Sequence, residues 1–436
     1  MNTWDSSIAV EGRRLDVVEP SQHVIIGLDG DHAAALPLVA TKVSRLLKLI
    51  CTLPQRVFDG DLRAMASAVG IDSNAAATML AFPETLSANV FARADVFSVA
   101  GEWRALEINI GSLVGGQPRA SLPRLCGFEQ DGDVLRNWAA STIKRWSMEN
   151  GYTVFVADES LVDEIRRPLS VYADEFAAQL GRDVPIVGPR SLKWDGCHLL
   201  HEGQCVDFVY CRFNEESVLS APDDYADLIS ATNAGAVCCP MALAYNAIGN
   251  KGVWALLWTM CDHGLLAADE AELVTTFLPR TVWLDERSLD AVLANQQKLV
   301  LKPVCGLEGR DVRLGNEATV EQWQSLVRAA ATQARSYVAQ ELVSPDVMTV
   351  SVADTSGNTH DEAAHVVWGV YVFGDNYLGC FLRGSPLGSS MVINVATGSS
   401  SGPVPPLRMD TNSDPLWQAS NSPSTKPATT AETTAR

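Results

Sequence analysis

The sequence predicts an α/β protein, and three observations support this fold class. Between residues 135 and 240, short apolar runs alternate with segments of helical periodicity, which is typical of a parallel sheet with helices on its faces. Paired β-runs joined by turn residues predict hairpins at 89–110, 299–315 and 365–383. Helical patterns before and between these hairpins complete a fold of α+β layers.

The composition is that of a soluble globular protein. The 436 residues include 47% hydrophobic and 19% charged residues, which is enough for a large core and two or three structural units. A net charge of −19 without any lysine- or arginine-rich block argues against nucleic acid and against an anionic membrane as partners. The acidic surface suits a polycationic substrate such as a polyamine, but solubility explains it equally well.

The cysteines and the first residues favour a cytoplasmic protein. The ten cysteines form no CxxC motif and no cysteine–histidine cluster with zinc spacing, so we expect reduced thiols. Residues 1–20 contain charges but no apolar core, and we therefore expect no signal peptide. No apolar run reaches the ~20 residues that span a bilayer.

The N-terminal part is predicted to contain a strand, several helices and then a hairpin. Residues 24–27 form the strand candidate, and apolar residues at three-to-four spacing predict a helix over residues 38–50. A helical pair follows over residues 61–90, with Ser73 and Asn74 as its expected cap. The hairpin has strands over residues 89–96 and 103–110 and a turn near Ala100 and Gly101.

This hairpin carries four polar side chains of chemical interest. Arg93 and Asp95 share one face of the first strand, and Glu107 and Asn109 share one face of the second, because side chains alternate along a strand. The two pairs meet across the hairpin if the register allows it. An arginine, two acids and an amide suit a metal–phosphate site; the alternative is a solvated face with a salt bridge.

The middle of the chain predicts a parallel layer followed by helices. Strand candidates lie at 154–157, 184–187 and 208–213, and a helix is expected around 160–181. Within the mainly helical stretch 240–290, Lys251 stands at the start of an apolar helix, where its charge opposes the helix dipole. A bound anion would remove this difficulty; otherwise Lys251 extends to solvent.

The hairpin at 299–315 combines a lysine with a glycine-bearing loop. Lys302 ends its first strand, and the loop Gly306-Leu307-Glu308-Gly309 follows. Glycine lets a backbone approach a ligand closely, a lysine can bind a phosphate as a point charge, and Glu308 can hold magnesium. The alternative is an ordinary surface hairpin with solvated charges.

The C-terminal part predicts a helix, a strand and a third hairpin. The helix spans 320–331 and the strand spans 337–343. The hairpin joins 365–373 to 377–383 through Gly374-Asp375-Asn376, a strong turn signal, and ends in Arg383. From about residue 403 the composition changes to proline, serine and threonine, so the last ~30 residues are expected to be disordered.

Four of these stretches together resemble the ATP-grasp amide-ligase module of glutathionylspermidine synthases and, more distantly, glutathione synthetases of the eukaryotic type. They are the Arg-x-Asp and Glu-x-Asn pairs of the first hairpin, the Asn-Lys-Gly lead-in and helix at 250–258, the Lys-Pro and Gly-x-Glu-Gly segment at 302–309, and Gln340-Glu341. The acidic pairs precede the two lysines, as in the circularly permuted branch of ATP-grasp proteins to which both families belong.

The resemblance implies a circularly permuted ATP-grasp fold, with ATP between two α+β subdomains. Residues 1–130 would form an N-terminal part with the metal- and phosphate-binding hairpin. Residues 131–240 would form an α/β substrate-binding layer, and residues 241–403 a nucleotide-binding part with a glycine-rich lid loop. Residues 404–436 would be the disordered tail.

The resemblance also implies roles for individual residues. The catalytic residues would be Arg93, which stabilises developing negative charge, and Ser112, the one small hydroxyl residue where the glutathionylspermidine synthase pattern has several. The implied ATP-binding residues are Lys251, Lys302, Gly306, Gly309, Gln340, Glu341 and Arg383. The implied ligands of magnesium, which we expect as two ions, are Asp95, Glu107, Asn109 and Glu308.

The implied activity is that of an ATP-dependent carboxylate–amine ligase, which forms an amide through an acyl phosphate and releases ADP and phosphate. Its substrates would be a small carboxylate and an amine, such as an amino acid, peptide, polyamine or carrier-bound group. The alternatives are a phosphotransferase and a non-catalytic nucleotide-binding protein. The sequence leaves the oligomeric state open, a homodimer included.

Overall fold

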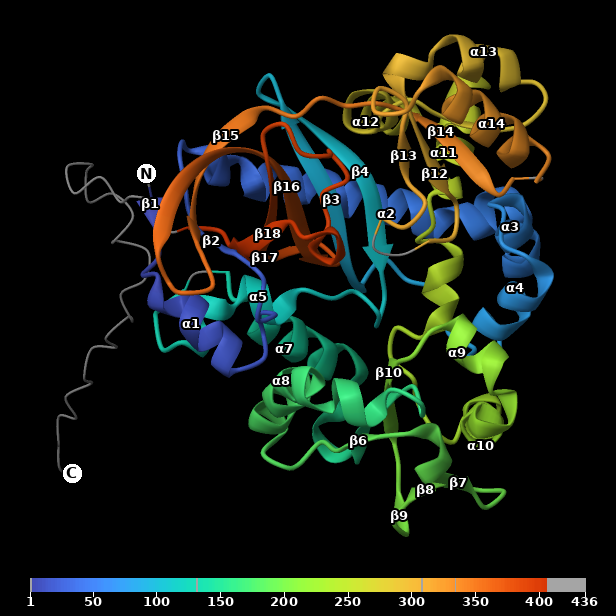
Figure 1. The fold of residues 1–436 in the computed structure, drawn as a ribbon. Coiled ribbons are helices and arrows are strands. Elements are labelled where there is room, and N and C mark those ends of the chain that lie inside the picture. The colour runs from blue at the N-terminus through green and yellow to red at the C-terminus, as the bar shows by residue number, and fades with distance from the viewer. Residues whose placement is uncertain (1, 131, 307–308, 334, 406–436) are drawn as a thin grey trace, which may run out of the picture.

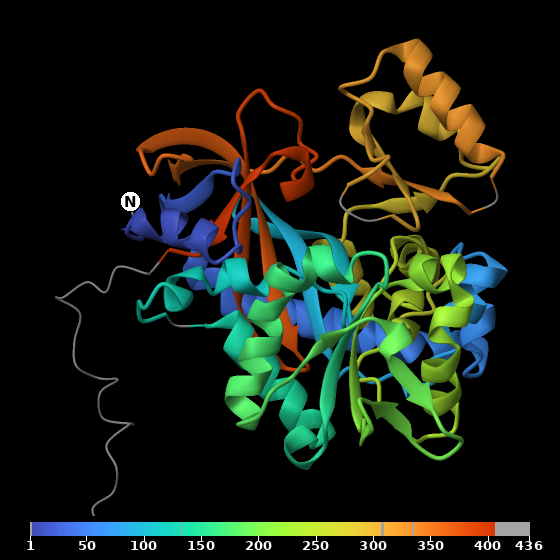
Figure 2. The ribbon, with the colours of Figure 1, turned by 60° about the horizontal axis from the view of Figure 1, so that its bottom comes forward.

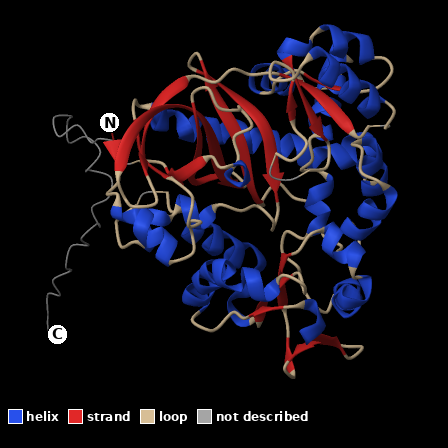
Figure 3. Cartoon of the chain, viewed as in Figure 1, coloured by secondary structure: helices blue, strands red, loops and turns tan. Residues whose placement is uncertain are grey.

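The computed structural model describes residues 2–130, 132–306, 309–333 and 335–405 (Figure 1). The predicted ligand Glu308 and almost all of the predicted tail lie outside these residues. Figure 3 shows the strands in separate groups, with helices packed between and beside them. Figure 2 shows a small sheet with its helices standing beside a large sheet, while an α/β layer lies below.

The large sheet is built from both ends of the chain. Its strands are β1 (Asn2–Thr3), β2 (Val24–Leu28), β3 (Phe91–Val99), β4 (Glu102–Ile110), β15 (Val347–Ala353), β16 (Thr359–Phe373), β17 (Asn376–Pro386) and β18 (Ser400–Pro403). β2 pairs with both β15 and β18, so that β2, β15, β16, β17 and β18 form a closed ring, and β3 and β4 extend it from β16. The predicted part 241–403 therefore contributes to two different sheets.

The predicted hairpin of β3 and β4 is confirmed, and its register places the four polar residues together. Arg93 lies opposite Asn109, and Asp95 lies opposite Glu107. Ala100 and Gly101 form the turn with positive φ values of 51° and 82°. All four side chains therefore share one face of the sheet, because residues directly opposite in a ladder point the same way.

The small sheet contains the second predicted hairpin. Its strands are β11 (Thr281–Trp283), β12 (Leu299–Pro303), β13 (Arg313–Leu314) and β14 (Tyr337–Glu341), in the order β11-β14-β12-β13. Helix α14 (Val320–Ala331) begins and ends at the predicted residues and buries Trp323 against Leu301 and Ala339. β11 lies in a stretch predicted to be mainly helical; a three-residue strand is too short to show a two-residue period.

The α/β layer is parallel, as predicted. Its strands are β5 (Thr153–Ala157), β6 (Ile186–Val187) and β10 (Phe208–Arg212), with β5 paired in parallel to both others. A short antiparallel sheet of β7 (Leu192–Trp194), β8 (Leu199–His201) and β9 (Gln204–Cys205) follows β6. Buried Trp138 packs on Phe176 and donates a hydrogen bond to Tyr210 Oη at 3.2 Å. This layer shares one core with the large sheet.

Helices cover these sheets and connect them. They are α1 (Ser7–Arg14), α2 (Leu36–Phe58), α3 (Leu62–Ala68), α4 (Ser73–Met79), α5 (Gln117–Ala120), α6 (Leu122–Leu125), α7 (Val134–Trp146), α8 (Val162–Leu180), α9 (Glu215–Ser220), α10 (Pro222–Asn233), α11 (Gly252–Asp262), α12 (Ala268–Phe277) and α13 (Leu289–Ala294), followed by α14. α2 passes behind the large sheet (Figure 1), and its Ser44 hydroxyl donates to the Gly374 carbonyl at 2.8 Å.

The predicted cap of α4 is wrong by one residue. Asp72, not Ser73 or Asn74, accepts hydrogen bonds from the backbone N–H groups of Asn74 and Ala75, at 2.9 and 3.0 Å. Aspartate is among the best N-cap residues, because its carboxylate satisfies free N–H groups of the first turn. In the part of the chain that the structure describes, no helix combines the length and apolar character needed to cross a membrane.

Candidate active site

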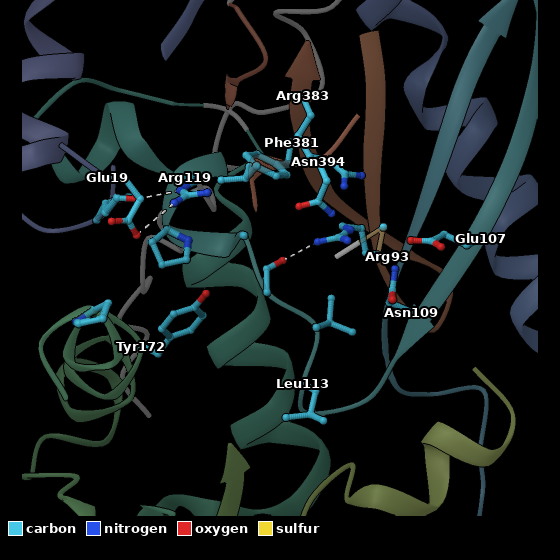
Figure 4. A pocket seen from close by; sticks show the side chains of 18 of the residues that line it. Glu19, Arg93, Glu107, Asn109, Leu113, Arg119, Tyr172, Phe381, Arg383 and Asn394 are labelled. Carbon is cyan, nitrogen blue, oxygen red and sulfur yellow. Dashed lines mark hydrogen bonds and ion pairs between the residues drawn. The ribbon is translucent and has the colours of Figure 1, made fainter. Parts of the chain in front are cut away.

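Two adjoining cavities lie where the large sheet, the small sheet and the α/β layer meet. The wide cavity, of about 380 Å³, has Glu107 of the large sheet on one side and Tyr172 of the α/β layer on the other (Figure 4). The slot is a narrower cavity of about 100 Å³ between the two sheets. The predicted site residues that line one or both cavities are Arg93, Asp95, Glu107, Asn109, Lys251, Lys302, Gly306, Gly309, Gln340, Glu341 and Arg383.

Asp95 is held between two arginines. Its carboxylate is 3.0 Å or less from both guanidinium groups, with Arg93 Nε at 2.9 Å and Arg383 Nη2 at 2.7 Å. Arg93 also donates to the Gly115 carbonyl at 3.0 Å and lies over the ring of Tyr371. All three charged groups are largely buried. Two positive charges against one negative charge leave this cluster with a net charge of +1, which favours an anion in the cavity.

Burial and charge act in opposite directions on the Arg93 guanidinium. Burial alone would lower its pKa, but the Asp95 carboxylate raises that pKa above its ordinary value. Arg93 is therefore a fixed cation at every pH at which the protein is folded, and its planar group is well suited to oxyanions.

The two predicted lysines approach Glu107 from different elements. Lys251 stands at the N-cap of α11, with Nζ 3.4 Å from Glu107 Oε2 and 3.0 Å from the carbonyl oxygen of Gly306, to which it donates. Lys302, on β12, is buried and donates to Gln340 Oε1 at 2.7 Å. A lysine at the start of a helix thus reaches over the cavity rather than into solvent.

The Asn-Lys-Gly sequence explains how Lys251 is positioned. The backbone N–H of Gly252 donates to Asn250 Oδ1 at 2.8 Å. A Cβ atom at position 252 would lie 2.3 Å from the carbonyl oxygen of Val69, so only glycine lets α11 begin this close to α3.

The lysines and Glu107 alter each other's acidity. Burial alone would raise the pKa of Glu107, but the charges of Lys251 and Lys302 hold it well below its ordinary value. Burial lowers the pKa of Lys302 to about 8, although the charge of Glu107 opposes this change. Glu107 is therefore a carboxylate at neutral pH, whereas Lys302 is a cation that deprotonates in mildly alkaline solution.

The slot has an apolar lining and a polar end. Phe97, Leu106, Val300, Leu342 and Ile393 are among its apolar residues. Such a narrow apolar slot next to two lysines suits a flat heteroaromatic ring that is linked to phosphates.

Gln340 and Glu341 lie at the slot but are already engaged within the protein. The Gln340 amide is 2% exposed, accepts from Lys302 and donates to Thr281 Oγ1 at 3.1 Å. The Glu341 carboxylate is exposed at the rim and accepts from the Arg280 backbone N–H at 3.2 Å. Gln340 therefore fixes the position of Lys302 in this structure.

The oxygen donors of Glu107 and Asn109 fit a magnesium ion. The side chains of Glu107 and Asn109 both line the wide cavity, and that of Glu107 lines the slot as well. Magnesium in nucleotide sites commonly takes one or two protein oxygens together with phosphate oxygens.

The other two predicted magnesium ligands are Asp95 and Glu308. Asp95 differs from the expectation, because two guanidinium groups already neutralise its carboxylate. Glu308 lies outside the described residues. Within these residues, no three histidine, cysteine, aspartate or glutamate side chains are grouped as metal ligands.

Ser112 does not face either cavity. It is 2% exposed, its N–H donates to the Met241 carbonyl at 2.9 Å, and its own carbonyl accepts from Arg212 at 2.8 Å. The backbone of Ser112 thus joins the loop after β4 to the α/β layer. Its hydroxyl is not placed to contact a substrate in the wide cavity, which differs from the predicted role.

Sequence reasoning missed Arg119 and Tyr172, which line the wide cavity on the side away from Glu107 (Figure 4). Arg119 donates through Nε to the Val17 carbonyl at 2.9 Å, and its side chain is 19% exposed. Its position just after Gly115 and Gly116 was the available signal, because glycine lets a backbone approach a ligand closely. Tyr172, in the middle of a predicted helix, gave no signal.

Comparison with known proteins supports the fold. Residues 177–377 match the family model described as circularly permuted ATP-grasp type 2. A protein of Frankia alni provisionally named glutamate–cysteine ligase 2-3 is 30% identical over 208 residues, which cover 45% of this chain and 23% of that protein. This chain thus spans about a quarter of the curated relative that it matches.

A solved structure agrees over nearly the whole chain. It is a glutathione synthetase-like effector from Globodera pallida in its apo form, with a TM-score of 0.55, 13% sequence identity and coverage of 91% of this chain and 92% of that chain. At this level of identity the likeness concerns the fold alone. The narrower resemblance to glutathionylspermidine synthases stays a prediction. The chain therefore has the mixed α/β fold of circularly permuted ATP-grasp proteins, and the family match itself rests on residues 177–377.

Proposed function

We propose that this protein is an ATP-dependent ligase that joins a carboxylate to an amine. The observation that carries the proposal is the convergence of Lys251 and Lys302 on Glu107, between an apolar slot and a wide cavity with arginines. A slot for a nucleotide base, cations for its phosphates and a separate cavity for a second substrate are the parts that such a reaction needs.

In the proposed reaction, a carboxylate oxygen of the acid attacks the γ-phosphorus of ATP, and ADP leaves. The nitrogen of the amine then attacks the carbonyl carbon of the acyl phosphate. The C–N bond forms, the C–O bond to phosphate breaks, and the amine loses a proton. The product is an amide, and inorganic phosphate is the second leaving group.

The residues of the site suit the charges that develop in this reaction. Lys302 and Lys251 would bind the ATP phosphates from the slot side, and Arg93 would face the transferring phosphoryl group and the tetrahedral oxyanion. Glu107 and Asn109 would hold magnesium, which neutralises phosphate charge when it is bound. The glycine-rich loop was predicted to exclude water as a lid, but its residues 307 and 308 lie outside the described part of the chain.

The acid substrate would occupy the wide cavity. The lining of this cavity carries one more positive than negative group, so a compound with negative charge is favoured over a neutral one. The cations are Arg93, Arg119, Lys251 and Arg383, and the carboxylates are Asp16, Glu19 and Glu107. In the proposed division of the chain, 131–240 supplies one wall for the substrate. The part 241–403 supplies both lysines and one side of the slot for ATP, and β3 and β4 supply the other side.

Magnesium-dependent ADP release tests the proposal. The protein would be given ATP with amino acids, small peptides and polyamines, singly and in pairs. We expect ADP and phosphate only when one acid and one amine are present together, with an equimolar amide product by mass spectrometry. ADP from an acid alone, without an amide in any pair, would instead identify a phosphotransferase.

The acidity of Lys302 predicts how ATP binding depends on pH. The pKa of Lys302 falls from its ordinary 10.5 to about 8 in the folded protein, so the binding cation is lost above pH 8. We expect the Kd for ATP to rise by about tenfold per pH unit between pH 8.5 and 10. Calorimetric titration across this range measures the change.

The variant Lys302→Arg shows whether the titration of Lys302, and not that of another group, causes the pH dependence of the Kd. In Lys302→Arg the cation persists at all these pH values, and the Kd should become nearly independent of pH. Between pH 8 and 10.5 the unfolded chain binds a proton that folded Lys302 has released, so this group makes the free energy of unfolding increase with pH there. An unchanged pH dependence in Lys302→Arg would contradict the assignment.

A further inference from the structure

A third cavity opens beside the wide cavity, on the side of α9 and α11. Its volume is about 130 Å³, and it shares Asn109 and Lys251 with the wide cavity. The other polar residues of this side cavity are Asn214, Glu215, Asn246 and Asn250. It therefore reaches the place where Glu107, Asn109 and Lys251 meet, but from another direction than the arginine-lined wall.

Asn250 supplies a fixed hydrogen-bond donor in this side cavity. The residue is 9% exposed, and its Oδ1 accepts from the Gly252 N–H at 2.8 Å, which fixes the orientation of the amide. Its Nδ2 is buried and has no hydrogen-bond partner among the described residues. A buried donor without a partner is destabilising, so a ligand with an acceptor oxygen would be favoured here.

Glu215 supplies a carboxylate to the same cavity. It is half-buried, and its Oε2 accepts from Asn246 Nδ2 at 3.0 Å. No lysine, arginine or histidine in the described ranges lies within 4.0 Å of it as an ion-pair partner. A half-buried carboxylate of this kind favours a positively charged ligand.

We propose that the side cavity binds the amine substrate and that this substrate is a small amino acid. Its ammonium group would be held by Glu215, and one of its carboxylate oxygens would accept from Asn250. A polyamine has no acceptor oxygen for Asn250, and the small volume disfavours a long peptide. This inference rests on the proposed ligase function, because it divides one reaction site between an acid and an amine.

Binding of amino acids to the full-length protein tests the inference without turnover. The twenty amino acids and spermidine would be titrated calorimetrically in the presence of magnesium and a non-hydrolysable ATP analogue. We expect at least one small amino acid to bind and spermidine not to compete with it. Glu215→Gln should weaken this binding by about tenfold or more, because the ion pair between the half-buried carboxylate and the ammonium group of the ligand is lost.

Three variants make the result specific. Asn250→Asp keeps the oxygen that accepts from the Gly252 N–H but removes the donor. It should weaken the binding of the same amino acid. Glu216→Gln changes the exposed neighbour on α9 and should bind as the wild type does. Asp223→Asn changes an exposed residue at the start of α10 and should also leave this binding unchanged. Unchanged affinity for the ATP analogue in each variant shows that the fold is intact.

The inference is overturned if no amino acid binds, if Glu215→Gln binds it as the wild type does, or if spermidine is the preferred ligand. Failure of the ligase proposal looks different. In that case an amino acid binds and depends on Glu215, but no acid in the panel produces ADP and an amide with it.

Discussion

Glu107→Gln is expected to reduce magnesium-dependent ADP release by about 100-fold or more. The carboxylate lies against Lys251, is held ionised by Lys251 and Lys302, and faces both cavities. Glutamine keeps its size but loses the charge that would bind magnesium, and loss of such a ligand removes transition-state stabilisation of several kcal/mol. Steady-state ADP release at saturating ATP measures the effect.

The stability of this variant should change little by comparison. The Glu107 side chain is 29% exposed and solvent screens its pairing with Lys251, so we expect a loss of no more than about 2 kcal/mol in the free energy of unfolding. Because Glu107 supports the charged form of Lys302, the pH above which ATP binding weakens should also shift downward. The pH dependence of ATP binding thereby tests the role of Glu107 without a measurement of turnover.

Glu102→Gln is the matched control for Glu107→Gln. Glu102 begins the same strand, β4, and is exposed, so its replacement should leave ADP release at the wild-type rate. Wild-type ADP release in Glu107→Gln would show that this carboxylate does not hold the metal.

The first hairpin shows how far sequence reasoning reaches. Side-chain alternation placed Arg93 with Asp95 on one face, and the turn at Ala100 and Gly101 was visible as a break between two β-runs. The register was not visible, because a shift by two residues would keep the same faces. Pairing starts at the two-residue turn, with Val99 opposite Glu102, and a bulge beside Asp95 then shifts the register so that Asp95 lies opposite Glu107.

Long-range partners account for most of what the sequence did not reveal. Arg383 was predicted near ATP, but its ion pair with Asp95 depends on the order β17-β16-β3 in the large sheet. The same sheet closes through pairing of β2 with β15 and β18, and β15 was not predicted at all. Such non-local pairings leave no periodic signal in a single segment, whereas the local pattern of α14 was sufficient for its bounds.

The position of Ser112 shows another limit of sequence reasoning. The resemblance gave it a substrate contact because of its spacing after Asn109. The positive φ of Gly111, 100°, turns the chain there, and the Ser112 backbone then bonds to Met241 and Arg212. Sequence spacing predicts which loop approaches a site, but the turn decides which side chain faces it.

The second large effect is expected for Asp95→Asn, which should lower the free energy of unfolding by about 3–5 kcal/mol. Asparagine has nearly the same shape but leaves the guanidinium groups of Arg93 and Arg383 without their counter-ion in a buried place. Removing one partner of a buried ion pair usually costs this much, because the remaining charge is not compensated. Urea unfolding followed by circular dichroism measures the loss.

Two further variants decide whether burial causes this loss. Asp262 pairs with Arg280 through two contacts of 2.7 and 2.6 Å, but both side chains are about half exposed, so Asp262→Asn should cost less than about 1 kcal/mol. Adding Arg383→Met to Asp95→Asn removes one uncompensated charge and should recover part of the lost stability. If Asp95→Asn cost no more than Asp262→Asn, the cavity would already solvate both arginines, and Asp95 would be free to bind a metal as the sequence predicted.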